Sequence, residues 1–153
     1  MYQRILVATD LTDASRAAVG TALELARTLG GKVTALHVTE PPYDTRRWFL
    51  PLDSRERAFF QQIIDREREA AERLLNEQVK EADPAHHDTS GVSSLVRSGI
   101  PSELIVQTAV EEGVGLIVMG THGRTGLKHA LLGSIAERVV RTSPCPVLTV
   151  RAR

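Results

Sequence analysis

The sequence predicts an α/β fold, in which an open five-stranded parallel sheet with the strand order 3-2-1-4-5 carries helices on both faces. Short apolar runs of β-like spacing alternate with longer stretches of helical period, which is the pattern of β-α-β units. The runs RILVAT and LIVM are mostly apolar, as expected for strands buried on both faces of a parallel sheet. A length of 153 residues suits one domain, so we expect residues 1–153 to form a single domain.

The first half of the chain is predicted to contain two strands and two helices. The strands are expected at Arg4–Thr9 and Lys32–Val38, and the helices from Thr12 or Asp13 to Leu29 and from about Ser54 to Ala82. Thr12 and Asp13 have side chains that can cap the free N–H groups at the start of a helix. A glycine pair follows the first helix and an Asp-Pro pair follows the second, and both pairs end helices. Three prolines between residues 39 and 53 predict a long loop there.

The second half is predicted to contain three strands and two helices. They are expected, in alternation, at Thr89–Val96, Pro101 to about Gly113, Leu116–Met119, Ser134–Arg141 and Pro146–Val150. Pro101 suits the first position of its helix, where the missing N–H would have no intrahelical partner. In the expected order the last strand lies at an edge of the sheet, and an apolar edge tends to be covered or paired. We therefore expect a homodimer formed through Val147 to Val150.

The composition excludes several classes of partner. The chain carries 19 basic and 19 acidic residues, and this balance gives no overall field to attract nucleic acid or an anionic membrane. The apolar run near the amino terminus is too short for a signal peptide, and no run of about twenty apolar residues could span a bilayer. We therefore expect a cytoplasmic protein. The lone Cys145 has no partner for an intrachain disulfide and is interpreted as a structural thiol.

Two strand ends carry the residues that indicate a function. Open parallel sheets bind ligands beyond the carboxyl ends of their strands, where the strand order reverses. Asp10 follows the first strand and Gly120 follows the fourth, and the order 3-2-1-4-5 makes these two strands neighbours. The two residues are therefore expected to lie at the same cleft.

A glycine-rich stretch, GTHGRTGLKHALLGS, follows the fourth strand and places glycines at 120, 123 and 133. Glycine lets a backbone approach a ligand closely and turn with positive φ. Gly133 and Ser134 would present the free N–H groups and the positive dipole end of the last helix to an anion. A phosphate group fits that description.

The same stretch concentrates positive charge in a neutral protein. Residues 120–135 include no acidic residue, and their basic and histidine side chains are Arg124, Lys128, His122 and His129. Across the cleft, Asp10 could accept hydrogen bonds from ribose hydroxyls, and the backbone of Val38 could bind the edge of an adenine. A base, a sugar and a phosphate chain would each have a partner. The residues therefore predict an adenine nucleotide that carries phosphates, with any Mg²⁺ arriving on the nucleotide.

Four segments of the chain match the pattern of a known family: ILVATD, LHV, LIVMGTHGRTGLKHALLGSIAERVV and PCPVLTV. On these segments the chain resembles the universal stress protein family over essentially its whole length. The G-x2-G-x9-G-S spacing with Asp10 resembles the ATP-binding branch, which implies a Rossmann-like fold akin to adenine nucleotide alpha hydrolases and a nucleotide-dependent role in the stress response. The family often has proline where this chain has Ala8, and alanine can also adopt the extended conformation needed there. The spacing and the resemblance together predict these cofactor-binding residues: Ala8, Thr9, Asp10, Val38, Met119, Gly120, Gly123, Arg124, Gly133, Ser134, Ile135 and Ala136.

Alternative interpretations stay open at this point. Asp10 could instead cap the first helix, a task that Thr12 or Asp13 can also perform. No Cys or carboxylate joins the two histidines of the glycine-rich stretch, so we predict no metal site there. The Walker A and G-x-G-x-x-G patterns are absent and no nucleophile and base form an evident pair, so rapid catalysis is not expected. The alternatives to an ATP-binding regulatory protein are a dimeric interaction protein with a vestigial pocket, using Trp48 and Phe49, and a slow ATPase or transferase.

Overall fold

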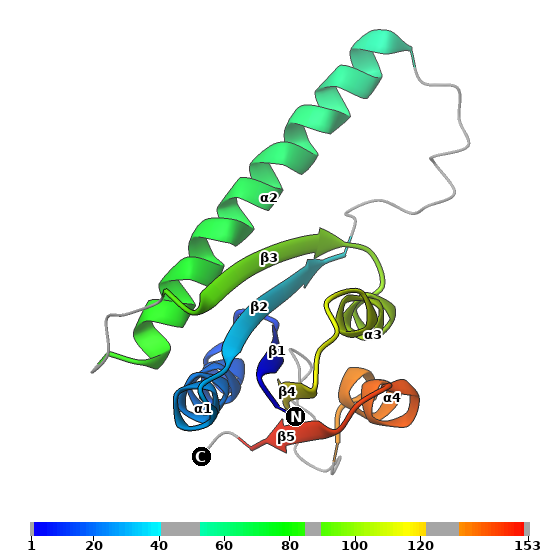
Figure 1. Ribbon diagram of the computed structural model, residues 1–153. Helices are drawn as coiled ribbons and strands as arrows, with labels where there is room; N and C mark the ends of the chain where they lie inside the picture. Colours follow the sequence, from blue (N-terminus) through cyan, green and yellow to red (C-terminus); the bar gives the residue numbers. More distant parts are fainter. Residues whose placement is uncertain (1, 41–52, 85–89, 122–131, 152–153) are drawn as a thin grey trace.

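A five-stranded parallel sheet with helices on both faces forms the body of the protein (Figure 1). The computed structural model describes residues 2–40, 53–84, 90–121 and 132–151. In chain order the elements are β1 Arg4–Thr9, α1 Asp13–Leu29, β2 Lys32–Thr39, α2 Ser54–Ala82, β3 Val92–Ser98, α3 Pro101–Glu111, β4 Leu116–Gly120, α4 Ser134–Thr142 and β5 Val147–Val150. The strand order is β3-β2-β1-β4-β5 and all four pairings are parallel. The predicted fold class and strand order are confirmed.

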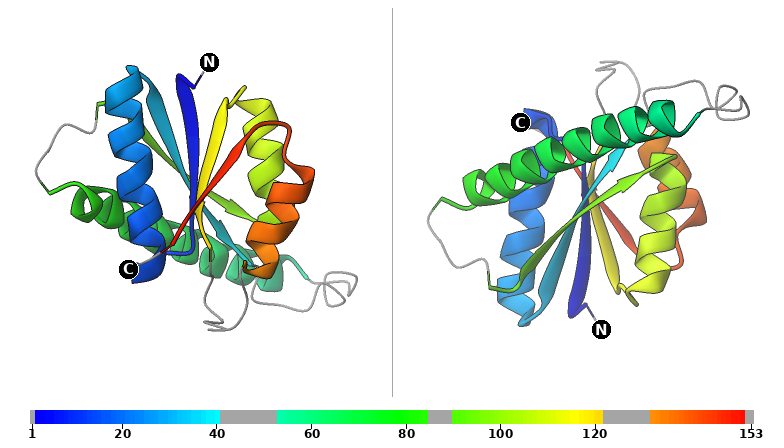
Figure 2. Two further views of the ribbon diagram at one scale, coloured as in Figure 1. Left: turned by 90° about the horizontal axis from the view of Figure 1, so that it is seen from below. Right: turned by 90° about the horizontal axis from the view of Figure 1, so that it is seen from above.

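Alternate residues of β1 supply two separate cores, one on each face of the sheet. Ile5 and Val7 belong to the cluster formed with α1 and α2, whereas Leu6 and Ala8 belong to the cluster formed with α3 and α4. Figure 2 shows these two pairs of helices on opposite sides of the sheet. All four residues are buried, because a central strand covered on both faces has no solvent-facing side. This is the physical reason for the continuous apolar run in the sequence.

The helix ends follow the predicted capping residues. Thr12 is the N-cap of α1, and its side chain accepts a hydrogen bond from the backbone N–H of Ser15. Gly30 ends the same helix in the left-handed conformation with φ of 63°, which glycine adopts without a steric penalty. Pro101 occupies the first turn of α3 as expected. These caps fix where α1 and α3 start relative to the ends of the strands.

The predicted bounds of the third strand were wrong. We expected Thr89–Val96, whereas β3 runs from Val92 to Ser98 and position 89 lies outside the described residues. Its register is set by β2, whose last residue, Thr39, pairs with Ser98. This edge strand exposes two consecutive serines at 93 and 94, so its sequence lacks the apolar alternation that would have located it.

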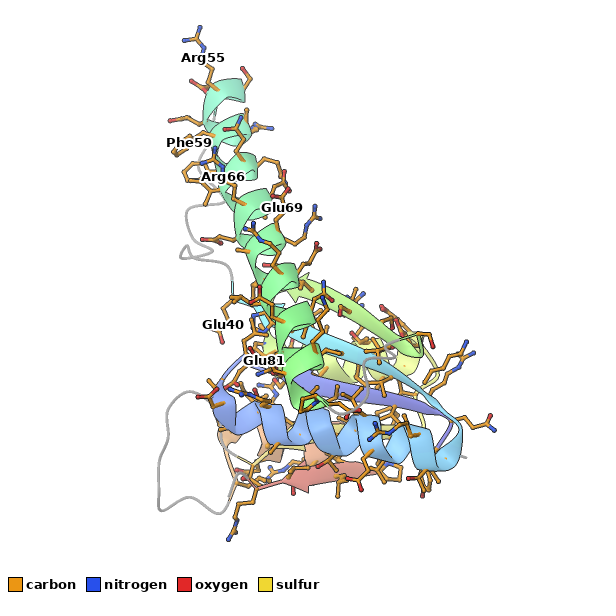
Figure 3. All side chains as sticks on the ribbon, turned by 90° about the vertical axis from the view of Figure 1, so that its left-hand side faces the viewer. Glu40, Arg55, Phe59, Arg66, Glu69 and Glu81 are labelled. Atoms are coloured by element: carbon orange, nitrogen blue, oxygen red, sulfur yellow. The ribbon has the colours of Figure 1, made fainter. Side chains whose placement is uncertain are left out.

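Helix α2 is much longer than the sheet it packs against, and its amino-terminal half extends beyond the body of the protein (Figures 1 and 3). In the sequence, Phe59, Leu74 and Val79 belong to one apolar stripe of helical spacing, which predicts a buried face along the helix. The helix is buried only towards its carboxyl end, where Ala71, Leu75 and Val79 are buried and the last two belong to the core. Phe59 is 61% exposed and Leu74 is 53% exposed, although both belonged to that stripe. The attachment of α2 therefore depends on its last three turns. Among the described residues, no helix has the length and apolar composition needed to cross a membrane.

Leu75→Ala is expected to destabilise the protein by about 2–5 kcal/mol. Leu75 is fully buried, at 0% exposure, and truncating it would leave a cavity under the attached part of α2. Chemical denaturation followed by circular dichroism measures the change in unfolding free energy. The exposed Leu74 provides the matched control, since Leu74→Ala removes no core contact and should change stability little. Equal effects of the two substitutions would show that α2 is not anchored in this way.

Candidate functional site

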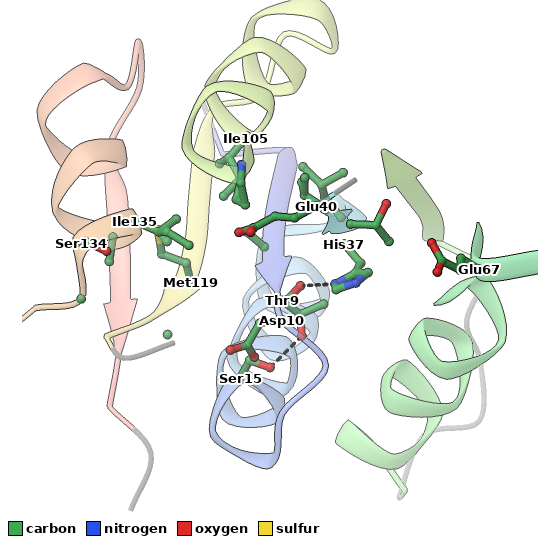
Figure 4. Close-up of a pocket in the computed structure, with 18 residues that line it drawn as sticks. Thr9, Asp10, Ser15, His37, Glu40, Glu67, Ile105, Met119, Ser134 and Ile135 are labelled. Atoms are coloured by element: carbon green, nitrogen blue, oxygen red, sulfur yellow. Dashed lines mark hydrogen bonds between the residues drawn. The ribbon is translucent and has the colours of Figure 1, made fainter. Parts of the chain in front are cut away.

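A cavity of about 720 Å³ opens at the carboxyl ends of β1, β2 and β4 (Figure 4). β1 is hydrogen-bonded to β2 on one side and to β4 on the other, so the cavity lies where the strand order reverses. The amino-terminal turns of α3 and α4, Ser15 of α1 and Glu67 of α2 complete its walls. The cavity therefore occupies the ligand site that this topology favours.

Ten of the twelve predicted cofactor-binding residues line the cavity. They are Ala8, Thr9, Asp10, Val38, Met119, Gly120, Gly133, Ser134, Ile135 and Ala136. The other two, Gly123 and Arg124, lie outside the described residues, as do the predicted basic residues His122, Lys128 and His129 and the aromatic pair Trp48 and Phe49. Residues from three strand ends and one helix, far apart in sequence, thus come together as predicted.

Eight lining residues were not predicted: Ser15, Leu36, His37, Thr39, Glu40, Glu67, Pro101 and Ile105. Those of β2 surround Val38 at the strand end, so the strand order alone could have located them. His37 is buried and its Nδ1 donates to the carbonyl oxygen of Thr9 at 2.9 Å, which ties β2 to β1 at the cavity. Glu67 lies on α2, and no sequence signal places that part of a charged helix beside a strand end.

The carboxylate of Asp10 is held on one side only. Its Oδ1 accepts hydrogen bonds from the backbone N–H of Thr12 at 3.1 Å and from the Thr12 hydroxyl at 2.6 Å. Its Oδ2 is buried and has no hydrogen-bond partner among the described residues. A buried carboxylate oxygen without a donor is costly, so this atom is suited to receive a donor from a ligand. The N-cap of α1 is Thr12, so the alternative interpretation, in which Asp10 caps this helix, was wrong.

The turn that carries Asp10 is conformationally strained. Leu11 has φ of 65° and is the one non-glycine residue with positive φ in the described part of the chain. The left-handed region costs an L-residue roughly 1–2 kcal/mol. In return the Leu11 N–H donates to the Thr9 hydroxyl at 3.1 Å, and the turn brings Thr12 onto the Asp10 carboxylate. Strain of this kind is concentrated at functional sites.

The start of α4 is open towards the cavity. Gly133 is its N-cap, and no side chain in the described part of the chain caps the helix. The N–H groups of the first turn have no acceptor within the helix itself. The residues of that turn, Ser134, Ile135 and Ala136, line the cavity. Neither Gly120 nor Gly133 has positive φ, which for Gly133 is −68°, so the predicted conformational reason for glycine does not apply at these positions.

The two ends of the cavity differ in charge. The open end of α4 carries the positive end of a helix dipole. Glu67 lines the cavity on the other side, beyond His37, and Glu40 lies between His37 and Ile105, as Figure 4 shows. Apolar side chains of Met119 and Ile105 lie between the two ends. No cluster of three or more histidine, cysteine, aspartate or glutamate residues that could hold a metal ion occurs in the described ranges.

Comparison with known proteins identifies the family. The model of the universal stress protein family matches residues 1–151. The chain belongs to the universal stress protein family. Among its relatives, the universal stress protein MJ0577 of Methanocaldococcus jannaschii is 31% identical over 157 residues, covering 100% of this chain and 97% of that protein. A solved structure of MJ0577 superimposes with a TM-score of 0.74 at 32% identity, covering 100% of this chain and 98% of the other.

Two other universal stress protein structures are described as nucleotide complexes. One, in complex with cAMP, has a TM-score of 0.66 and 24% identity over 99% of this chain and 98% of its own. Another, from Archaeoglobus fulgidus in complex with dAMP, has a TM-score of 0.55 and 20% identity over 98% of both chains. At these identities the likeness establishes the shared Rossmann-like fold of universal stress proteins.

Proposed function

We propose that this protein binds ATP in the cavity at the carboxyl ends of β1, β2 and β4, and that the nucleotide acts as a regulatory ligand. The observation that carries the proposal is the buried Oδ2 of Asp10, which has no hydrogen-bond partner among the described residues. A ribose hydroxyl is a donor of the right kind for this atom. A ligand that filled the cavity would satisfy it.

The remaining parts of ATP have partners on either side of Asp10. The uncapped N–H groups of Ser134 and Ile135 would bind phosphate oxygens, with the helix dipole favouring their negative charge. The backbone at Val38 would bind the edge of the adenine. Glu67 supports this orientation, because a polyphosphate placed at its end of the cavity would be repelled.

The relatives support an adenine nucleotide as the class of ligand. Two structures of universal stress proteins are described as complexes with cAMP and with dAMP, and both ligands contain adenine, a sugar and one phosphate. The described residues offer no carboxylate cluster for a metal. Mg²⁺ would therefore arrive on the phosphates and keep most of its ligands from the nucleotide and water.

Calorimetric titration of the purified protein with ATP tests the proposal. The expected result is saturable binding with a stoichiometry of one nucleotide per chain, together with an adenine nucleotide released from protein denatured after purification. Adenosine should bind more weakly than ATP, since it lacks the phosphates that α4 would hold. A protein that purifies without nucleotide and gives no heat with ATP would instead favour the interaction protein with a vestigial pocket.

We also propose that the protein is a homodimer formed through β5. This strand is hydrogen-bonded to β4 and lies at an edge of the sheet, and Leu148 on it is 37% exposed. An apolar edge strand offers unpaired backbone groups to a second strand. About a twofold axis, two copies of β5 would pair with each other.

Leu148→Lys is expected to convert the dimer to a monomer, because a charged side chain on an edge strand opposes pairing. Sedimentation velocity measures the change in assembly. The control is Val110→Lys, which introduces the same charge at a site that is 63% exposed and lies on α3 instead of on the edge strand. Dimers that persist in Leu148→Lys, or monomers in the unsubstituted protein, would contradict the proposed interface.

A further inference from the structure

One side chain of α2 is hydrogen-bonded to both ends of the turn that carries Asp10. Gln78 is 7% exposed, and its Oε1 accepts a hydrogen bond from the Thr9 hydroxyl at 2.5 Å. Its Nε2 donates to the carbonyl oxygen of Thr12 at 2.9 Å. The amide of Gln78 thus bridges the residue before Asp10 and the residue that holds the Asp10 carboxylate.

The bridge continues into the strained part of the turn. The Thr9 hydroxyl lies 2.7 Å from the Ser15 hydroxyl and accepts the N–H of Leu11, the residue in the left-handed conformation. Thr12 in turn donates to Asp10 Oδ1 through both its N–H and its hydroxyl. In a buried network each of these bonds is stronger than in water, and removing one member leaves others unsatisfied. The position of Asp10 Oδ2 therefore depends on the amide of Gln78.

We infer that Gln78 is a positioning residue of the proposed nucleotide site, which fixes the turn from Thr9 to Thr12 so that Asp10 Oδ2 meets a ribose hydroxyl. The inference rests on the proposed function. Gln78 lies between Leu75 and Val79, the residues that anchor α2 in the core. Ribose recognition is consequently coupled to the docking of α2, and coupling of this kind acts in both directions.

A purely structural role for Gln78 makes a different prediction. If the amide only stabilised the fold, its loss would lower the free energy of unfolding and lower the affinity for every nucleotide in the same proportion. A positioning role changes the recognition of the ribose hydroxyls alone. The dissociation constant of 2′,3′-dideoxyATP divided by that of ATP separates the two roles. DideoxyATP has no ribose hydroxyl that could donate a hydrogen bond to Asp10.

The experiment measures this ratio by calorimetry for the unsubstituted protein, Gln78→Met and Gln61→Met. Methionine keeps the length of glutamine without its hydrogen bonds. Gln61 is the matched control, since it lies exposed on the same helix and bonds to Asp65, not to the turn. The ratio is expected to be about 10–100 in the unsubstituted protein and in Gln61→Met, and to fall towards one in Gln78→Met with dideoxyATP affinity retained.

A second variant covers the case in which Gln78→Met does not fold. Gln78→Glu keeps the acceptor for Thr9 and loses the donor to Thr12, so the ratio should fall in this variant as well. An unchanged ratio in the folded Gln78 variant, whether both affinities are retained or both fall equally, would overturn this inference and leave the proposed function standing. A failure of the unsubstituted protein to bind ATP would overturn the proposed function, and the inference with it.

Discussion

Asp10→Ala is expected to weaken ATP binding by about ten- to a hundredfold, which corresponds to the 1.5–3 kcal/mol of a hydrogen bond to a charged group. The substitution removes the buried Oδ2 that has no partner among the described residues, and with it the proposed acceptor for the ribose. Calorimetric titration with ATP measures the loss. Binding of 2′,3′-dideoxyATP should change much less, since that nucleotide makes no hydroxyl contact.

Two further variants isolate the role of Oδ2. Asp10→Asn keeps the oxygen that accepts from Thr12 and replaces the other oxygen with an amide donor, so it should preserve the turn and still lose ATP affinity. Asp13→Ala removes a nearby carboxylate that is exposed and absent from the cavity lining, and it should bind ATP normally. Folded Asp10→Ala with unchanged ATP affinity would contradict the ribose assignment.

Ser134→Pro is expected to weaken ATP binding by about tenfold or more while leaving α4 intact. Proline suits the first helical position and removes one N–H from the open turn. The preceding Gly133 has φ of −68° and ψ of 155°, a conformation that a following proline favours. The substitution therefore removes a donor proposed for phosphate without disturbing the helix that carries it.

Ser134→Ala is the matched control, since it removes the hydroxyl and keeps the N–H. It should retain more ATP affinity than Ser134→Pro, and both variants should bind adenosine as the unsubstituted protein does. Titrations with ATP and adenosine, with circular dichroism to verify the fold, provide the comparison. Equal ATP affinity of the proline and alanine variants would mean that the backbone of α4 does not hold the phosphates.

Much of the fold could be predicted because its signals are local. The continuous apolar run of β1 follows from burial on both faces, and Thr12 and Gly30 mark the ends of α1 through capping. The edge strand β3 could not be located well, because exposed serines interrupt its apolar pattern. Burial along α2 was also misjudged, since Phe59 and Leu74 have the right spacing for a core stripe and yet are exposed.

The candidate site also has residues that could be predicted from the sequence and residues that could not. Asp10 and Gly120 could be predicted to line one cavity because a parallel sheet brings the carboxyl ends of neighbouring strands together. Gln78 and Glu67 could not, since they lie in a long helix rich in polar residues whose register depends on tertiary packing. That Asp10 Oδ2 has no hydrogen-bond partner among the described residues could not be predicted either, because it depends on how the strained turn directs Thr12 to the other oxygen.

A crystal structure of the protein with ATP tests the central claim most directly. The account predicts a ribose hydroxyl within hydrogen-bonding distance of Asp10 Oδ2, phosphate oxygens on the N–H groups of Ser134 and Ile135, and the adenine beside Val38. A complex with the phosphates at the Glu67 end of the cavity, or with Asp10 Oδ2 still without a donor, would contradict it.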